Sequence, residues 1–157
     1  MTNKLILKIK KLDREATLPD YAYYGDAGLD LYANADILIK PLERVIVPTG
    51  VALEIPDGYV GLIWDKSSLG IQKILKTLGG VVDSGYRGEV KIGLINLSKE
   101  DFQISRGQKI AQMIIQKKEG VEVQEVEILS ESERDVKNFG SSNQRGDRWV
   151  ISKDKNA

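Results

Sequence analysis

Residues 45–64, VIVPTGVALEIPDGYVGLIW, contain three short apolar runs separated by Pro48-Thr49-Gly50 and Pro56-Asp57-Gly58. Short runs rich in β-branched residues and bounded by Pro, Gly and Asp are typical of strands joined by tight turns. This stretch indicates an all-β protein. The strands that it predicts are 45–47, 51–55 and 59–64.

The same pattern continues on both sides of this stretch. Residues 89–96 and 109–116 are strand-like, 5–9 alternates weakly, and the valines of 121–128 continue the pattern imperfectly. A last strand is possible at 149–151. Closely spaced short strands predict a sandwich or barrel.

One segment fits two structures. Ile71, Ile74, Leu75 and Leu78 have the i, i+3, i+4, i+7 spacing of a helix face. A turn of helix followed by a hairpin that ends near Gly79-Gly80 fits equally well.

Composition limits the chemistry. The chain has 157 residues, 23 basic and 23 acidic, which suits one ordinary domain and argues against a general nucleic-acid binder. It has no His and no Cys, which excludes Ser-His-Asp and Cys-His schemes and the usual zinc sites. Any acid–base group must be a carboxylate, Lys or Tyr, and any metal a hard ion, with Mg²⁺ first. No targeting segment or membrane-spanning run is visible, so we expect a cytoplasmic protein without a membrane partner.

The composition changes after Leu129. Residues 1–129 form the predicted β domain, and residues 130–157 are a polar arm with one aromatic residue, Phe139, in its first part. A solvated linker and a mobile lid over an active site have the same composition.

Three loops could carry chemistry. Residues 79–88 combine glycines with Asp83 and Tyr86, whereas 65–70 and 138–143 are rich in hydroxyls. Each loop alone fits a structural turn. Together they offer groups for phosphates, a base, a sugar and one carboxylate, as a nucleoside triphosphate hydrolase without His would need. No Walker-type or Gly-x-Gly-x-x-Gly loop is present.

The chain resembles the trimeric deoxyuridine triphosphatases through five ordered motifs between residues 27 and 143. These motifs are 27–33 (AGLDLYA), 66–69 (KSSL), 80–89 (GVVDSGYRGE), 106–112 (RGQKIAQ) and 134–143, around Phe139-Gly140-Ser141-Ser142.

The resemblance implies a jelly-roll-like β-barrel of the dUTPase type. It also implies a homotrimer with active sites at subunit interfaces and a flexible C-terminal arm, 130–157, that carries the fifth motif. The implied reaction is hydrolysis of dUTP to dUMP and pyrophosphate with Mg²⁺, which removes dUTP from the nucleotide pool and supplies dUMP for thymidylate synthesis.

The resemblance also implies residue roles. Asp83 matches the carboxylate that orients and deprotonates the attacking water, and Gln112 lies near that water or the α-phosphate. Asp30 is a structural carboxylate or a metal ligand through water. Tyr86 packs under deoxyribose, and the backbone of 78–82 binds the uracil edge. The implied substrate-binding residues are Lys66, Ser67, Ser68, Thr77, Gly80, Val81, Val82, Tyr86, Lys91, Arg134, Phe139, Gly140, Ser141 and Ser142.

This chain departs from the family pattern at four places. Lys66 replaces an Arg, which keeps the charge but loses the bidentate fork. Gly85 stands where an acid is common, and Thr77 stands where some relatives have a uracil-contacting Asn. The fifth motif has few glycines, because Asp135, Lys137, Asn138 and Asn143 occupy glycine positions.

Two other functions fit the sequence less well. The related dCTP deaminases have a Trp at the Tyr86 position and a Glu on the next strand, whereas residues 91–96 contain no Glu. A non-catalytic dUTP-binding regulator would not need Asp83, Gln112 and Tyr86 together.

Overall fold

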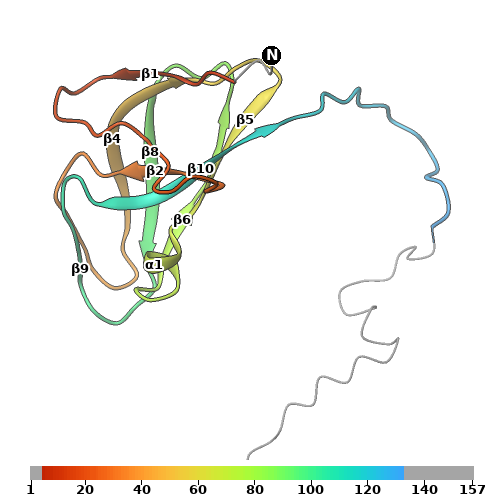
Figure 1. Cartoon of the computed structure of the whole chain (residues 1–157). Coiled ribbons are helices and arrows are strands. Elements are labelled where there is room, and N and C mark those ends of the chain that lie inside the picture. Colours follow the sequence, from red (N-terminus) through yellow and green to blue (C-terminus); the bar gives the residue numbers. More distant parts are fainter. Residues whose placement is uncertain (1–4, 133–157) are drawn as a thin grey trace, which may run out of the picture. The chain divides into compact units, whose positions relative to one another are not determined.

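The computed structural model describes residues 5–132 of the chain (Figure 1). The chain divides into two units, Met1–Gly120 and Val121–Ala157. The fifth motif at 134–143 and the predicted strand at 149–151 lie outside the described residues. Among residues 5–132 the single helix is one turn long, far too short to cross a bilayer.

The first unit is built from two four-stranded antiparallel sheets and a two-stranded ribbon. One sheet has the order β1 (Lys8–Lys11), β4 (Arg44–Glu54), β8 (Glu89–Asn96), β6 (Leu75–Leu78). The other has the order β2 (Leu29–Tyr32), β10 (Lys109–Lys117), β5 (Tyr59–Asp65), β7 (Val81–Asp83). The ribbon pairs β3 (Ile37–Ile39) with β9 (Phe102–Ile104).

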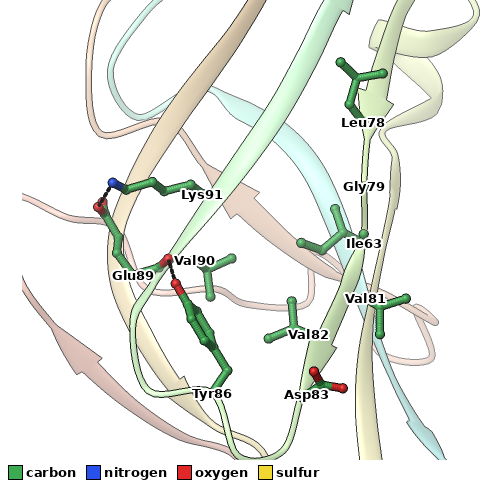
Figure 2. Close-up of a pocket in the computed structure, with 11 residues that line it drawn as sticks. Ile63, Leu78, Gly79, Val81, Val82, Asp83, Tyr86, Glu89, Val90 and Lys91 are labelled. Atoms are coloured by element: carbon green, nitrogen blue, oxygen red, sulfur yellow. Dashed lines mark hydrogen bonds and ion pairs between the residues drawn. The ribbon is translucent and has the colours of Figure 1, made fainter.

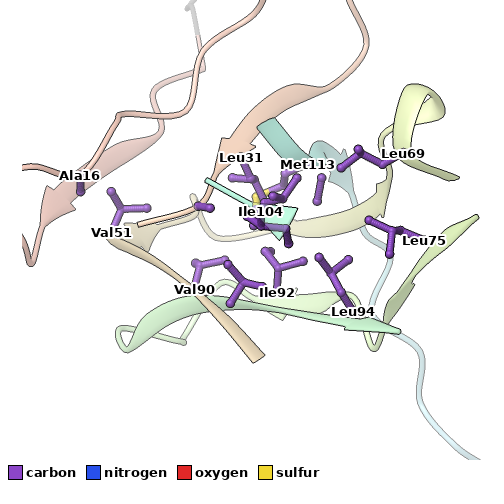
Figure 3. Close-up of a cluster of buried hydrophobic side chains, with 14 of the residues drawn as sticks. Ala16, Leu31, Val51, Leu69, Leu75, Val90, Ile92, Leu94, Ile104 and Met113 are labelled. Carbon is purple, nitrogen blue, oxygen red and sulfur yellow. The ribbon is translucent and has the colours of Figure 1, made fainter. Parts of the chain in front are cut away.

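The core lies between the two sheets (Figure 3). Along β8, Val90, Ile92 and Leu94 alternate with more exposed residues, as expected of a strand with one buried face. They face Leu31 of β2 and Met113 of β10, and both of these are fully buried. This two-layer packing confirms the predicted jelly-roll-like all-β fold, and the predicted strands 59–64, 89–96 and 109–116 are present as β5, β8 and β10.

The predicted turn at Pro48-Thr49-Gly50 is wrong. Strand β4 runs through these residues, and its pairing with β8 shifts register between Pro48 and Ala52. The Thr49 hydroxyl donates to the Val90 carbonyl at 2.5 Å, and the Gly50 N–H donates to the Glu89 carboxylate at 2.9 Å. Because these side chains satisfy the irregular backbone, the strand continues through a bulge instead of reversing.

Neither structure expected for 71–80 is present in full: a turn of helix comes just before this segment, but β6 pairs with β8 and β7 pairs with β5, so the two strands form no hairpin at Gly79-Gly80. Helix α1 (Ser67–Gly70) stops after one turn, and Ile74 has a left-handed φ of 58°, which ends any helical continuation. Leu75 then begins strand β6. The helical spacing of the apolar residues is coincidental, because Ile71 is exposed and only Leu75 is fully buried.

The strand expected within 121–128 is also wrong. Residues 121–132 form no helix or strand and are exposed. Alternating Val and Glu over 121–128 has the period of a strand, but that pattern has no paired neighbour in the part of this chain that the structure describes.

Candidate active site

A pocket of about 340 Å³ opens between β6, β7 and β8 (Figure 2). Ile63, Val82 and Val90 give it an apolar wall, and the connection Gly79–Gly80 adds bare backbone. Asp83, Tyr86, Glu89 and Lys91 bring polar groups to the same pocket. An apolar pocket with a few convergent polar groups is the usual form of a small-molecule site.

Gly80 shapes the entry into β7. Its φ is +138°, and a Cβ built there would lie 2.8 Å from the Ile63 carbonyl oxygen. The Gly80 carbonyl accepts a hydrogen bond from the Ile63 N–H at 2.7 Å. This close approach places β7 at the edge of its sheet, beside β5. Among residues 5–132, no strand pairs with the outer edge of β7, so backbone donors and acceptors there are available to a ligand.

Tyr86 follows the β7 turn and is half exposed. Its hydroxyl donates to the Glu89 carbonyl at 3.0 Å, which fixes the ring across the pocket mouth (Figure 2). Glu89 Oε2 lies 3.6 Å from Lys91 Nζ, a loose ion pair on an exposed rim. The Asp83 carboxylate has no hydrogen bond or ion pair with any other residue that the structure describes, so its oxygens are free to accept a proton or a water.

A second group of predicted site residues lies around the adjoining ends of β2, β5 and β10. Gln112 on β10 is paired in register with Asp30 and Trp64, and its Nε2 donates to the Asp65 carbonyl at 2.9 Å. A Cβ at Gly28 would lie 2.9 Å from Gln112 Oε1 and 3.1 Å from Gln112 Cβ. The absence of a side chain at position 28 therefore sets where the Gln112 amide can point.

Asp30 is the buried centre of this second group. Its side chain is 3% exposed, Lys66 Nζ donates to Oδ1 at 2.6 Å, and Lys109 Nζ lies 2.7 Å from Oδ2 at an angle poor for a hydrogen bond. Burial raises the pKa of the Asp30 carboxyl, but the contacts from Lys109 and Lys66 outweigh burial and hold the pKa below its ordinary value. Asp30 is thus a charged structural carboxylate.

The neighbouring hydroxyl-rich loop leads into α1. Lys66 is the N-cap of α1 and makes no side-chain cap hydrogen bond, so Ser67 is not the capping residue. Ser67 and Ser68 are exposed in the first turn, beside the Asp30 group. Leu69 is the residue that anchors the turn in the core.

Thr77 lies on β6 and is buried. Its hydroxyl donates to Asp65 Oδ1 at 2.6 Å, and its N–H donates to the same oxygen at 2.8 Å. Lys76 Nζ contacts Asp65 Oδ2 at 2.6 Å. The Thr77 hydroxyl is therefore held by Asp65. Thr77 does not line the 340 Å³ pocket, but it lines an adjoining one of about 230 Å³ that shares Gly79–Val81 with it.

Within one chain, the pocket beside β7 and the group around Asp30 lie far apart. Asp83 is paired with Val60 of β5, whereas Gln112 is paired with Trp64 at the other end of β5. Four residues along a strand and two strand spacings place the two Cα atoms roughly 16 Å apart. We call the pocket beside β7 the nucleoside half (Ile63, Leu78–Asp83, Tyr86, Lys91), after the part of the substrate that the resemblance leads us to expect there. We call the second group the phosphate half (Gly28, Asp30, Lys66–Ser68, Lys109, Gln112), for the same reason.

We find no group of side chains in the described part of one chain that could hold a metal ion alone. Within 5–132 there is no cluster of three or more acidic side chains. Both oxygens of Asp30 are occupied by ammonium groups, which a divalent cation would have to displace.

Sequence reasoning did not identify Asp65 and Lys109 as site residues. Asp65 joins β5 to β6 through Thr77 and Lys76, and Lys109 is the second partner of Asp30. Lys109 lies within the motif at 106–112, three residues before Gln112. Its closeness to Asp30 depends on the pairing of β10 with β2, which the sequence does not show. Asp65 could have been recognised as a site residue from its position at the end of a predicted strand, next to Lys66.

The chain is similar to known proteins over most of its length. A family model described as dUTPase matches residues 14–143. The deoxyuridine 5'-triphosphate nucleotidohydrolase of Clostridium kluyveri is 43% identical over 138 residues, which cover 87% of this chain and 96% of that protein. The Corynebacterium glutamicum protein of the same name is 44% identical over 145 residues, covering 90% and 97%.

The fold is also similar to those of solved dUTPase structures. The Staphylococcus bacteriophage 80alpha dUTPase with dUPNHPP superposes with a TM-score of 0.82 at 31% identity, over 90% of this chain and 99% of that one. A mutant dUTPase from phage phi11 of S. aureus, described with a structural Mg(II) ion, gives a TM-score of 0.74 at 27% identity, over 78% and 97%.

Proposed function

The chain belongs to the dUTPase family and is a dUTP diphosphatase, and we propose that each of its active sites is assembled from different copies of the chain in a homotrimer. The observation that carries this proposal is the separation of Asp83 from Gln112 along β5. Both residues are expected to act at the same water and α-phosphate, and roughly 16 Å is too far for that within one chain. A nucleoside half from one copy and a phosphate half from the next would bring them together.

The nucleoside half suits deoxyuridine. Uracil presents one N–H donor between two carbonyl acceptors, and unpaired backbone on β7 and at Gly79–Gly80 can match such an edge. Cytosine offers the opposite pattern of donors and acceptors at its exocyclic group, and the thymine methyl needs space that a tight backbone contact does not leave. The Tyr86 ring, held by the Glu89 carbonyl, would pack under the sugar and exclude a 2′-hydroxyl.

The phosphate half suits the triphosphate. Lys66 supplies a positive charge beside the exposed hydroxyls of Ser67 and Ser68, and Gln112 offers an amide held in place by the Asp65 carbonyl. Lys91 adds a second positive charge on the rim of the nucleoside half.

The chemistry follows from the charges. A carboxylate is ionised at neutral pH, and the free oxygens of Asp83 can orient a water and take its proton. Attack of that water on the α-phosphorus breaks the bond to the bridging oxygen of the β-phosphate, so dUMP and pyrophosphate leave. Phosphoryl transfer relies mainly on positioning and charge stabilisation, which is the task of the phosphate half.

We infer that Mg²⁺ arrives with dUTP, held by phosphate oxygens and water. Magnesium binds phosphate oxygens readily and keeps several waters. This agrees with the lack of an acidic cluster in residues 5–132 and with the occupied carboxylate of Asp30. The cation would neutralise part of the triphosphate charge.

The arm would complete the site. We propose that Phe139 covers the uracil ring and that Arg134, Gly140, Ser141 and Ser142 close over the phosphates, as the fifth motif implies.

A nucleotide-pool enzyme acts where free dUTP occurs, and we therefore propose that this activity belongs in the cytoplasm.

The first test is pyrophosphate release by the purified protein with Mg²⁺ and dUTP, dCTP, dTTP or UTP. Release from dUTP alone is the expected result, since base and sugar are each read in the nucleoside half. Ammonia release from dCTP would point to the deaminase reaction. Binding of dUTP without hydrolysis would point to a regulator.

The second test concerns the shared site. Asp83→Asn and Gln112→Ala copies would be co-expressed with two different affinity tags, and mixed trimers purified through both tags. Each parent should be nearly inactive. A closed ring of three that contains both variants has one site with both residues intact, so mixed trimers should recover about one third of wild-type activity. Mixed trimers as inactive as their parents would show that both residues serve from the same chain.

A further inference from the structure

The most heavily charged group in the phosphate half contains two lysines and one carboxylate. Asp30 comes from β2, Lys66 immediately precedes α1, and Lys109 begins β10. The ammonium groups lie 2.6 Å and 2.7 Å from the two oxygens of Asp30. Three separate segments of the chain therefore converge on one buried carboxylate.

The charges of this group do not cancel. Asp30 contributes one negative charge, whereas Lys66 and Lys109 contribute two positive charges, so the group keeps one positive charge. The carboxylate is 3% exposed, but the lysine side chains are 27% and 40% exposed. The excess positive charge is thus presented toward solvent while the negative charge is buried.

Lys109 is held more firmly than a surface lysine. The close contact with the Asp30 carboxylate and its negative charge raise the pKa of Lys109, so the ammonium form is stabilised at this position. Its Nζ also lies 6.0 Å from the centre of the Tyr32 ring, at the outer limit of a cation–π contact. A cation with a fixed position loses less freedom when an anion binds to it.

The group lies where the phosphates are expected. Asp30 is the register partner of Gln112, and Lys66 is next to Ser67. One Lys is a single point charge, whereas the planar fork of an Arg would bind two phosphate oxygens at once.

We propose that Lys66 and Lys109 form a paired-ammonium clamp for the phosphate chain, with Asp30 fixing the distance between them. This inference rests on the proposed function and assigns Lys109 a binding role that neither motif nor pocket indicated. The second lysine replaces the second contact that an Arg would make. It also offsets Asp30, which would otherwise neutralise Lys66.

The test is binding of pyrophosphate and of dUMP by calorimetry, measured on the full chain without turnover. Lys109→Met leaves the group with no net charge, so pyrophosphate affinity should fall about tenfold, while dUMP affinity changes little. KM for dUTP should rise with a smaller change in kcat. Lys109→Arg keeps the charge and should retain most of the affinity.

A double variant separates charge from structure. Asp30→Asn with Lys109→Met restores one net positive charge through Lys66, so it should bind pyrophosphate more tightly than Lys109→Met alone. A purely structural role for Lys109 predicts the reverse, since the double variant loses more contacts. Weaker binding by the double variant, or unchanged binding by Lys109→Met, would overturn the clamp.

Lys8→Met is the matched control. Lys8 also lies 2.7 Å from a carboxylate, that of Glu54, but on the β1–β4 edge away from the site. Lys8→Met makes the same change in total charge as Lys109→Met and should leave pyrophosphate binding unchanged.

If Lys109→Met does not fold, the proposal can still be tested with Lys109→Arg and with the salt dependence of pyrophosphate binding by the wild type. A clamp of two ammonium groups predicts a steep loss of pyrophosphate affinity with salt, and a flat dependence contradicts it. Absence of dUTP hydrolysis by the wild type would refute the proposed function and leave these binding results readable.

Discussion

The nucleoside half and the phosphate half are built in opposite ways. Most of the nucleoside half comes from one continuous stretch, residues 78–91, on edge strands β6 and β7 and the neighbouring β8. The phosphate half is assembled from three distant segments around the buried Asp30. Asp83 has free oxygens, whereas both Asp30 oxygens are occupied. The nucleoside half thus offers unpaired backbone and a free carboxylate to a ligand. The phosphate half holds charged side chains in fixed places.

The largest difference between the halves should appear when their carboxylates are replaced. Asp83→Asn removes the proton acceptor and should lower kcat by about 10²–10⁴-fold. The melting temperature should stay within the error of the wild type, because no hydrogen bond or ion pair joins this carboxylate to another residue within 5–132. Binding of a non-hydrolysable dUTP analogue, measured by calorimetry, should be largely intact. Retained hydrolysis would mean that another group is the base.

This contrast also explains how far sequence reasoning could go. Gly79–Gly80, Asp83 and Tyr86 are neighbours in the chain and the structure brings them to one pocket, but alone they fitted a structural turn, and the family resemblance was needed to single them out. The alternation of β8 was equally local. Lys109 and Asp30 are far apart in sequence, and they meet only because β10 pairs with β2. The bulge in β4 was missed for the same reason, since Glu89 of the neighbouring strand satisfies it.

A smaller effect is expected from adding one methyl group to each half. In Gly28→Ala the new Cβ would lie 3.1 Å from Gln112 Cβ, which cannot swing away as the amide can. The Gln112 amide should shift, and kcat should fall roughly tenfold, as small misplacements at a reaction centre allow. Pyrophosphate release under saturating dUTP measures this.

Gly85→Ala is the matched change next to the nucleoside half, in the turn between Asp83 and Tyr86. No atom lies within 4 Å of a Cβ at this position, and its φ is not in the left-handed region. Activity should therefore remain within twofold of the wild type. Equal losses in the two variants would show that the spacing around Gln112 is not the sensitive feature.

The smallest effect is one of stability, and it depends on pH. The folded state lowers the pKa of Asp30, so its charged form stabilises the protein above the ordinary carboxyl pKa of 3.8, and that contribution is lost as pH falls through the lower, folded value. At pH 7, Asp30→Asn should lower the melting temperature by about 5 °C, because two lysines lose a buried partner. The difference from wild type should shrink once the pH falls below about 4.

Glu54→Gln tests whether burial causes this effect. The Lys8–Glu54 contact is 2.7 Å long, close to the Asp30 contacts, and it also lowers the pKa of its carboxyl, but both side chains are well exposed. Solvent and salt weaken such a pair, so its loss should change the melting temperature by about 1 °C or less at any pH. Scanning calorimetry of the three proteins from pH 3 to pH 8 compares them directly. If Glu54→Gln lowered the melting temperature as much as Asp30→Asn, any close contact between a lysine and a carboxylate would stabilise the protein equally. The burial of Asp30 would then not explain its effect on stability.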